Sequence, residues 1–118
     1  MHKSPAKEDD DTLRPLASLI SKSEKAQQKL TPKTWQHSML CKNLKALHLA
    51  YALMKDEAAP ATHDDLKAGL EAFASMIEKT GNTIAKFPLG TSQHTLQRNR
   101  LRALREAEAR IMSELNEN

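Results

Sequence analysis

The fold of this chain is decided by the stretch between residues 31 and 56, which reads TPKTWQHSMLCKNLKALHLAYALMKD. Thr31 is a common helix cap and Pro32 suits a first helical position, so the stretch predicts a helix over residues 32–56. At about 100° per residue, its apolar side chains form two neighbouring stripes covering roughly 220°, about twice the apolar width of an ordinary surface helix. A helix this apolar must be covered on two sides, by its own chain or by another.

The two stripes have different interpretations. One stripe consists of Leu40, Leu44, Leu47, Tyr51 and Met54, and the other of Trp35, Met39, Ala46, Leu49, Ala50 and Leu53. We expect the core of the chain to take Leu40, Leu44, Leu47 and Tyr51. Part of the second stripe is either core or a surface for a partner protein, since tryptophan and methionine are enriched at the centres of interfaces. The candidate partner-binding residues are Trp35, Met39, Leu49 and Leu53.

The segment before this helix predicts another helix over about residues 12–30. Asp9, Asp10 and Asp11 suit a helix N-terminus, and a proline such as Pro15 is tolerated in a first turn. Residues 1–11 are polar and are therefore expected to form a flexible tail.

The segment after it predicts two more helices. Thr62 followed by Asp65 resembles a capping box, which starts a helix over about residues 63–80, with Gly81 as its stop. A last helix spans about residues 92–115 and is capped by Thr91 or Ser92. Residues 12–118 are thus expected to form a single all-α domain, a bundle or array of four main helices.

The composition agrees with a helical protein. The chain of 118 residues has 16 leucines and 16 alanines, three glycines and no valine, which nearly excludes a sheet. Its one cysteine excludes an internal disulfide and a cysteine-only zinc site. No apolar run is long enough for a membrane span, and the first residues have no apolar segment typical of a secretory signal. We therefore expect a cytoplasmic protein without a membrane partner.

Residues with potential chemistry are few. His37 and Cys41 are one helical turn apart, a spacing that would suit an activated thiolate or half of a metal site, but a packing role is the stronger interpretation. His63, Asp64 and Asp65 stand where a helix begins and are better explained as capping residues. No phosphate-binding loop, dinucleotide fingerprint or zinc-protease motif is present. We expect no catalytic residues, no metal and no cofactor, and hence no enzyme.

The charge distribution offers a second class of function. The net charge is +3, but residues 12–56 alone carry eight basic and two acidic side chains. In the last helix, Arg98, Arg102 and Arg105 line up on one face, where they would either follow a phosphate backbone or pair with acidic residues one turn away. A small helical nucleic-acid-binding protein using these three arginines is therefore the alternative hypothesis.

With no catalytic motif in view, the chain resembles bacterial quorum-sensing anti-activators. The resemblance lies in its length and in two segments, TPKTWQHSMLCKNLKALHLAYALM at residues 31–54 and GTSQHTLQRNRLRALREAEARIM at residues 90–112. It implies a small all-α protein that binds the ligand-binding domain of a LuxR-type transcription activator, occupies its dimerisation surface and so prevents DNA binding. No individual residue role follows from it. The leading hypothesis is a cytoplasmic, non-enzymatic regulator of a partner protein, which is also able to form a homodimer.

Overall fold

The computed structural model describes residues 4–57 and 61–117, with side chains from residue 11 onward, and it is all-α over these ranges. Four helices follow one another along the chain: α1 (Ser4–Gln28), α2 (Trp35–Met54), α3 (His63–Ile84) and α4 (Ser92–Glu117). The expected class, a bundle or array of four main helices, is confirmed.

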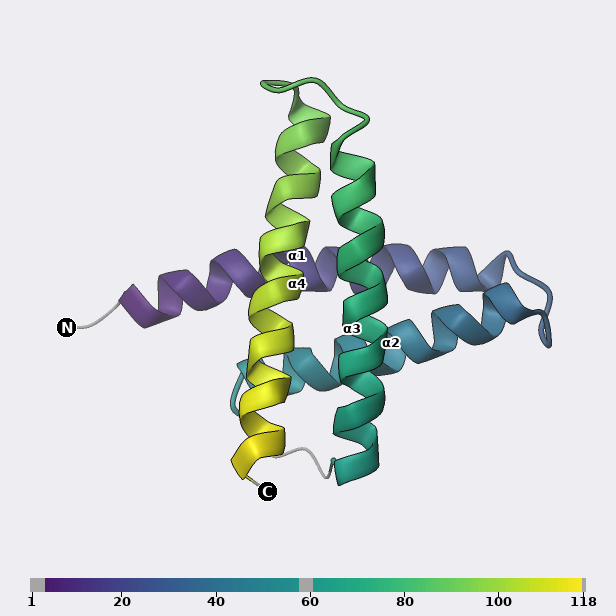
Figure 1. Ribbon diagram of the computed structural model, residues 1–118, viewed down its shortest axis with the longest axis vertical. Coiled ribbons are helices and arrows are strands. Elements are labelled where there is room, and N and C mark those ends of the chain that lie inside the picture. The colour runs from purple at the N-terminus through teal and green to yellow at the C-terminus, as the bar shows by residue number, and fades with distance from the viewer. Residues whose placement is uncertain (1–3, 58–60, 118) are drawn as a thin grey trace.

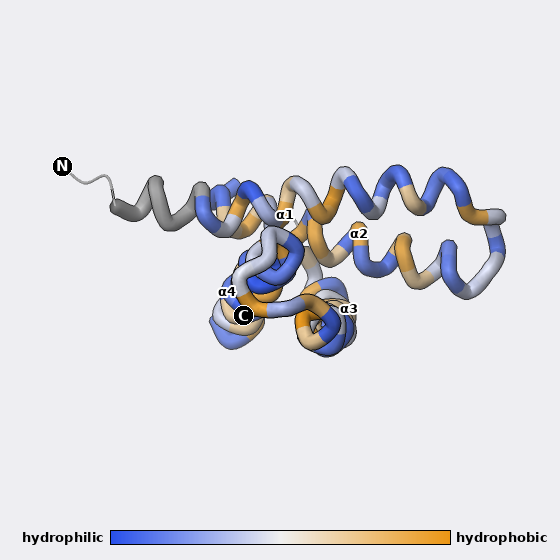
Figure 2. The backbone as a smooth tube through the Cα atoms, turned by 90° about the horizontal axis from the view of Figure 1, so that it is seen from above, coloured by the Kyte–Doolittle hydropathy of each residue, from blue (hydrophilic) through white to orange (hydrophobic). Residues whose placement is uncertain are grey.

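The helices form two layers that cross each other (Figure 1). Antiparallel helices α1 and α2 make one layer, and antiparallel helices α3 and α4 make the other (Figure 2). The molecule is flat, with extents of 39 × 37 × 21 Å. The end of the first layer that holds the α1–α2 connection projects beyond α3, so the N-terminal part of α2 has little of its own chain over it.

The core lies where the two layers cross. Its buried members come from all four helices: Leu16, Ala46, Leu47, Ala50, Leu53, Leu66, Phe73, Ala103, Leu104, Ala107 and Ile111. Helix α2 contacts each of the other three helices, which explains why its apolar surface is so wide. Both stripes of α2 contribute to this core, because residues 44–54 lie under the crossing layer.

The helix α1 begins at Ser4, eight residues before the predicted start. It takes in residues 4–11 of the expected tail, while residues 1–3 lie outside the described part of the chain. A start near residue 12 would place Pro15 in the first turn of the helix, yet Pro15 lies inside α1. Proline removes one backbone hydrogen bond there. Burial of Leu16 and of Thr12, whose hydroxyl donates to the Glu106 carboxylate of α4, compensates for that loss.

The helix α2 begins at Trp35 rather than at residue 32. Lys33 has a positive φ of 77°, which no helix accommodates, and the hydroxyl of Thr34 then accepts the His37 backbone N–H at 3.2 Å. Its end is Met54, two residues short of the prediction, with Asp56 at a φ of 58°. The cap is therefore Thr34, because a helix can begin only after the left-handed residue.

The helices α3 and α4 begin where the sequence predicts. Thr62 and Asp65 form the expected capping box, and Thr91 caps α4 by accepting the His94 N–H at 3.2 Å. Gly81 does not end α3, which continues to Ile84. The helix ends later because Gly81 keeps a helical conformation, whereas the left-handed glycine of this region is Gly90, with a φ of 87°. Within the described ranges, no helix is long and apolar enough to cross a membrane.

Candidate protein-binding groove

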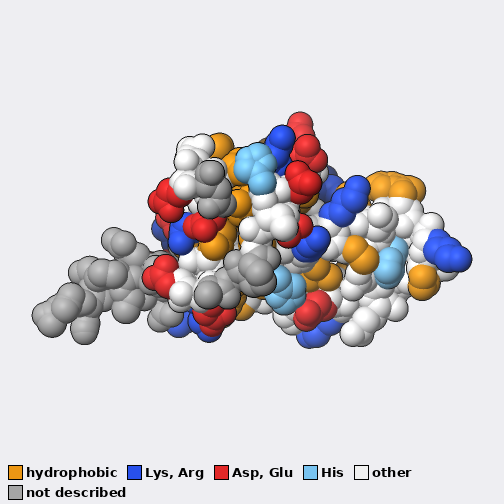
Figure 3. Space-filling view, turned by 90° about the horizontal axis from the view of Figure 1, so that it is seen from below, with side chains coloured by type: hydrophobic (Ala, Val, Ile, Leu, Met, Phe, Trp, Pro, Cys, Tyr) orange, Lys and Arg blue, Asp and Glu red, His pale blue; other side chains and the backbone are white. Residues whose placement is uncertain are grey.

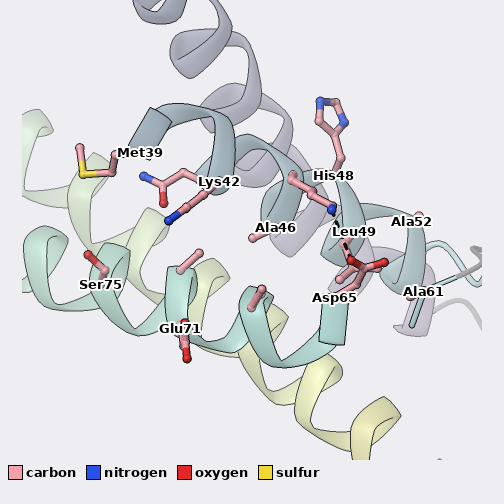
Figure 4. Close-up of a pocket in the computed structure, with 15 residues that line it drawn as sticks. Met39, Lys42, Ala46, His48, Leu49, Ala52, Ala61, Asp65, Glu71 and Ser75 are labelled. Carbon is pink, nitrogen blue, oxygen red and sulfur yellow. Dashed lines mark ion pairs between the residues drawn. The ribbon is translucent and has the colours of Figure 1, made fainter. Parts of the chain in front are cut away.

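A groove of about 610 Å³ lies between α2 and α3 (Figure 4). Its floor is made of small side chains, namely Ala46, Ala52, Ala61, Ala68, Gly69 and Ala72. Met39 and Leu49 of α2 add larger apolar surface. The groove runs from Met39 and Ser75 at one end to Ala52 and Ala61 at the other. A surface of this shape would receive larger apolar side chains from another molecule.

The groove has a floor of small residues because α3 lies close to α2 at Gly69. A Cβ at this position would lie 3.6 Å from Cδ2 of Leu49 and 3.4 Å from Cδ1 of Ile111. Gly69 therefore lets the α3 backbone sit against Leu49, and the alanines on both sides keep the floor flat. Because the residues of the floor are small, the groove has room for larger side chains of another molecule.

The rim of the groove is charged, with opposite signs on its two sides. Helix α2 supplies the ammonium groups of Lys42 and Lys45, with the His48 ring beside them, and α3 supplies the carboxylates of Asp65 and Glu71. The ammonium of Lys45 lies 3.3 Å from a carboxylate oxygen of Asp65 and joins the two sides. The backbone N–H of Thr62 donates to the Asp65 carboxylate and, together with Lys45, holds the pKa of Asp65 below its ordinary value. This rim would orient a partner that carries both signs of charge.

The four residues predicted to bind a partner fall in three different environments. Trp35 is 69% exposed at the projecting end of α2, one helical turn before Met39 and on the same face. Met39 and Leu49 are half-buried and line the groove. Leu53 is only 5% exposed and belongs to the core, so its assignment to a partner surface is wrong. The crossing of α3 and α4 over the end of α2 explains this difference.

Of the residues assigned to the core, Leu44 and Leu47 are buried, whereas Leu40 and Tyr51 are half-buried. No residue on the α3 side of the groove was among those predicted from the sequence to bind a partner. The signal for this side was a small-residue face, with Ala68, Gly69 and Ala72 at helical spacing. Nothing in the sequence indicated that this face meets α2.

His37 and Cys41 do lie together, with Sγ of Cys41 3.8 Å from Nδ1 of His37. The side-chain amide of Gln27 donates to the same sulfur at 2.7 Å. Cys41 is exposed. In the described part of the chain, no group of three or more histidine, cysteine or acidic residues is placed to hold a metal ion. At the start of α3, Asp65 has the capping role expected of it.

The three arginines of the alternative hypothesis are exposed on α4. Arg98, Arg102 and Arg105 line a shallow depression together with Leu101 and Glu106. No ion pair joins any of the three to another residue that the structure describes. The expected pairing of these arginines with acidic residues one turn away is therefore not seen among the described residues. Arg110 of the same helix instead lies with its guanidinium 3.0 Å from Glu114.

The face of the molecule seen in Figure 3 carries side chains of several kinds. Figure 3 shows hydrophobic side chains among lysine, arginine and histidine side chains toward the end of the molecule away from the N-terminus. Comparison of the chain with protein-family models, curated proteins and solved structures finds no match.

Proposed function

We propose that this chain is a non-enzymatic regulatory protein that binds an apolar helix of a partner protein in the groove between α2 and α3. The observation that carries the proposal is the exposed Trp35 next to a groove with a floor of small residues. Covering the exposed part of such a ring would remove about 100–170 Å² from water, worth roughly 2.5–4 kcal/mol before the costs of association. Trp35 would be the anchor, and Met39 and Leu49 would pack beside it.

The resemblance to anti-activators suggests what the partner is. We propose the ligand-binding domain of a LuxR-type transcription activator, held by a helix of its dimerisation surface. A dimerisation helix is apolar along one face and is flanked by charges, which suits the basic α2 rim and the acidic α3 rim. Occupation of that helix would keep the activator monomeric and release it from DNA.

The test is an electrophoretic mobility assay in which the protein is titrated into a purified LuxR-type activator bound to its operator. We expect the wild-type protein to release the activator, and Trp35→Ala with Met39→Ala to need at least about 30-fold more protein, since a central anchor is worth 2 kcal/mol or more. Leu89→Ala is the matched control, because Leu89 is 83% exposed in the α3–α4 connection and far from the groove in sequence.

Two outcomes would contradict the proposal. If the wild-type protein leaves the activator on DNA at every concentration, the LuxR-type partner is wrong. If the Trp35 and Met39 variant acts like the wild type, the groove is the wrong surface. A second copy of this chain could also occupy the groove. Light scattering on the same samples tests this, because a homodimer that needs Trp35 would become a monomer in the variant.

The second candidate function is nucleic-acid binding by the exposed arginines of α4. Its test uses the same operator DNA without the activator. Charge reversal at Arg98, Arg102 and Arg105 should abolish a complex that weakens steeply as salt rises, and it should leave the activity of an apolar groove intact. Failure of the wild-type protein to shift the DNA at low salt would exclude this candidate.

A further inference from the structure

Arg100 is a buried basic residue whose Nε has no hydrogen-bond partner. Arg100 is 9% exposed, although it lies in α4 among basic residues. Its Nε is buried with no hydrogen-bond partner, and no ion pair joins the group to any residue that the structure describes. Buried charges are normally paired, because removing an unpaired charge from water is costly. An unpaired cation in this position therefore points to an anion from outside the chain.

The surroundings of Arg100 supply more positive charge. Arg100 lines a groove of about 620 Å³ whose other wall is one face of α1. This wall carries Lys22, Lys25 and Lys29, with the hydroxyls of Ser18 and Ser21 beside them. The three lysines span about 10 Å along the helix axis and are all exposed. None of them has an ion pair with another described residue.

From this arrangement we propose that the groove between α1 and α4 binds a small polyphosphate, such as a nucleoside triphosphate or free inorganic polyphosphate. One phosphate group would pair with the Arg100 guanidinium, whose planar fork matches phosphate oxygens. The following phosphates would extend along Lys25 and Lys29, and the serine hydroxyls would donate hydrogen bonds. Duplex DNA is disfavoured because its backbone cannot reach a side chain as buried as Arg100.

The test is isothermal titration calorimetry of the full chain with tripolyphosphate, ATP and adenosine, without magnesium, at about 0.15 M salt. We expect tripolyphosphate and ATP to bind and adenosine not to bind. Arg100→Met, which keeps the apolar stem, should weaken binding at least tenfold. The double variant Lys25→Gln with Lys29→Gln should also weaken it at least tenfold, and it tests the site without changing a buried residue.

The control variant is Lys67→Gln with Lys79→Gln, which removes the same charge from exposed positions of α3, a helix that does not contact α1. Its affinity should stay within about twofold of the wild type. Thermal melts give a second readout, because tripolyphosphate should raise the Tm of the wild type and of the control but not that of Arg100→Met. The free Arg100→Met protein should melt no lower than the wild type, since it loses a charge that has no partner.

Three results would overturn the inference. The first is the absence of binding by tripolyphosphate and ATP. The second is an equal loss of affinity in the α3 control, which would mean that net charge alone attracts the anion. The third is tighter binding of a 20-base-pair duplex that competes with tripolyphosphate and is lost in Arg100→Met, because the site would then serve nucleic acid.

Discussion

Leu53 and Trp35 belong to one apolar stripe of α2 but lie in different environments in the structure. Their substitutions to alanine should therefore lower the free energy of unfolding by amounts that differ by several kcal/mol. Leu53 is 5% exposed in the core, so Leu53→Ala removes buried methyl groups and leaves a cavity. Buried leucine-to-alanine changes cost about 2–5 kcal/mol. Trp35 is 69% exposed, and Trp35→Ala should change the free energy of unfolding by about 0.5 kcal/mol or less, as at other exposed positions.

These free energies convert into a difference in Tm that is simple to measure. With an unfolding entropy of about 2.1 cal/mol/K per residue, a chain of this length loses roughly 4 °C per kcal/mol. Leu53→Ala should therefore melt about 8–20 °C below the wild type and Trp35→Ala within about 2 °C of it, when followed by circular dichroism at 222 nm. A Trp35 variant that loses as much as the Leu53 variant would place the tryptophan in the core and remove the anchor from the proposed groove.

Further predictions concern glycines, a cap and the thiol. Gly81→Ala should raise stability by about 1 kcal/mol in urea unfolding, because Gly81 is helical with open space around it, whereas Gly90→Ala, at a φ of 87°, should lower it. The backbone N–H of Thr62 and the ammonium of Lys45 lower the pKa of the Asp65 carboxylate in the folded state, so its stabilising effect is present at neutral pH. The Tm gap between wild type and Asp65→Asn should close as the pH falls below the ordinary aspartate pKa and through the lowered one, and a gap that widens there would contradict this assignment. Cys41 is exposed, so the native protein should react completely with a thiol reagent, and protection until unfolding would show that Cys41 is covered.

The helical class was predictable because it depends on local signals. The Thr62–Asp65 capping box and the Thr91 cap were readable from residue type and spacing alone. The errors arose where tertiary packing decides. Pro15 ought to end or start a helix, but burial of Leu16 and Thr12 holds α1 together across it. Gly81 suits a helix stop, yet α3 continues through it because it keeps helical φ and ψ.

The helix face that carries the candidate site could be predicted from the sequence, but the part of that face left uncovered could not. Periodicity tells where a residue lies around a helix, so it placed Trp35, Met39, Leu49 and Leu53 on one stripe. It does not tell where along the axis a neighbouring layer begins. In the structure the crossing layer covers Leu53 and leaves the projecting end at Trp35 open, so a single stripe is core at one end and surface at the other.

The burial of Arg100 could not be predicted from the sequence for the same geometric reason. Arg100 lies in a run of arginines. In the linear sequence it cannot be distinguished from Arg98 and Arg102, which belong to the same basic segment. On α4 the alternation turns Arg100 away from its neighbours and into the crossing with α1, where Lys25 and Lys29 already gather positive charge. Burying a cation next to other cations, with no acidic partner among the described residues, lowers the stability of the folded state. A bound anion would remove this penalty. The two grooves therefore differ in kind: the α2–α3 groove is apolar with a charged rim, whereas the charged residues lining the α1–α4 groove are all basic. Separate sets of variants can therefore disable either groove without altering the other.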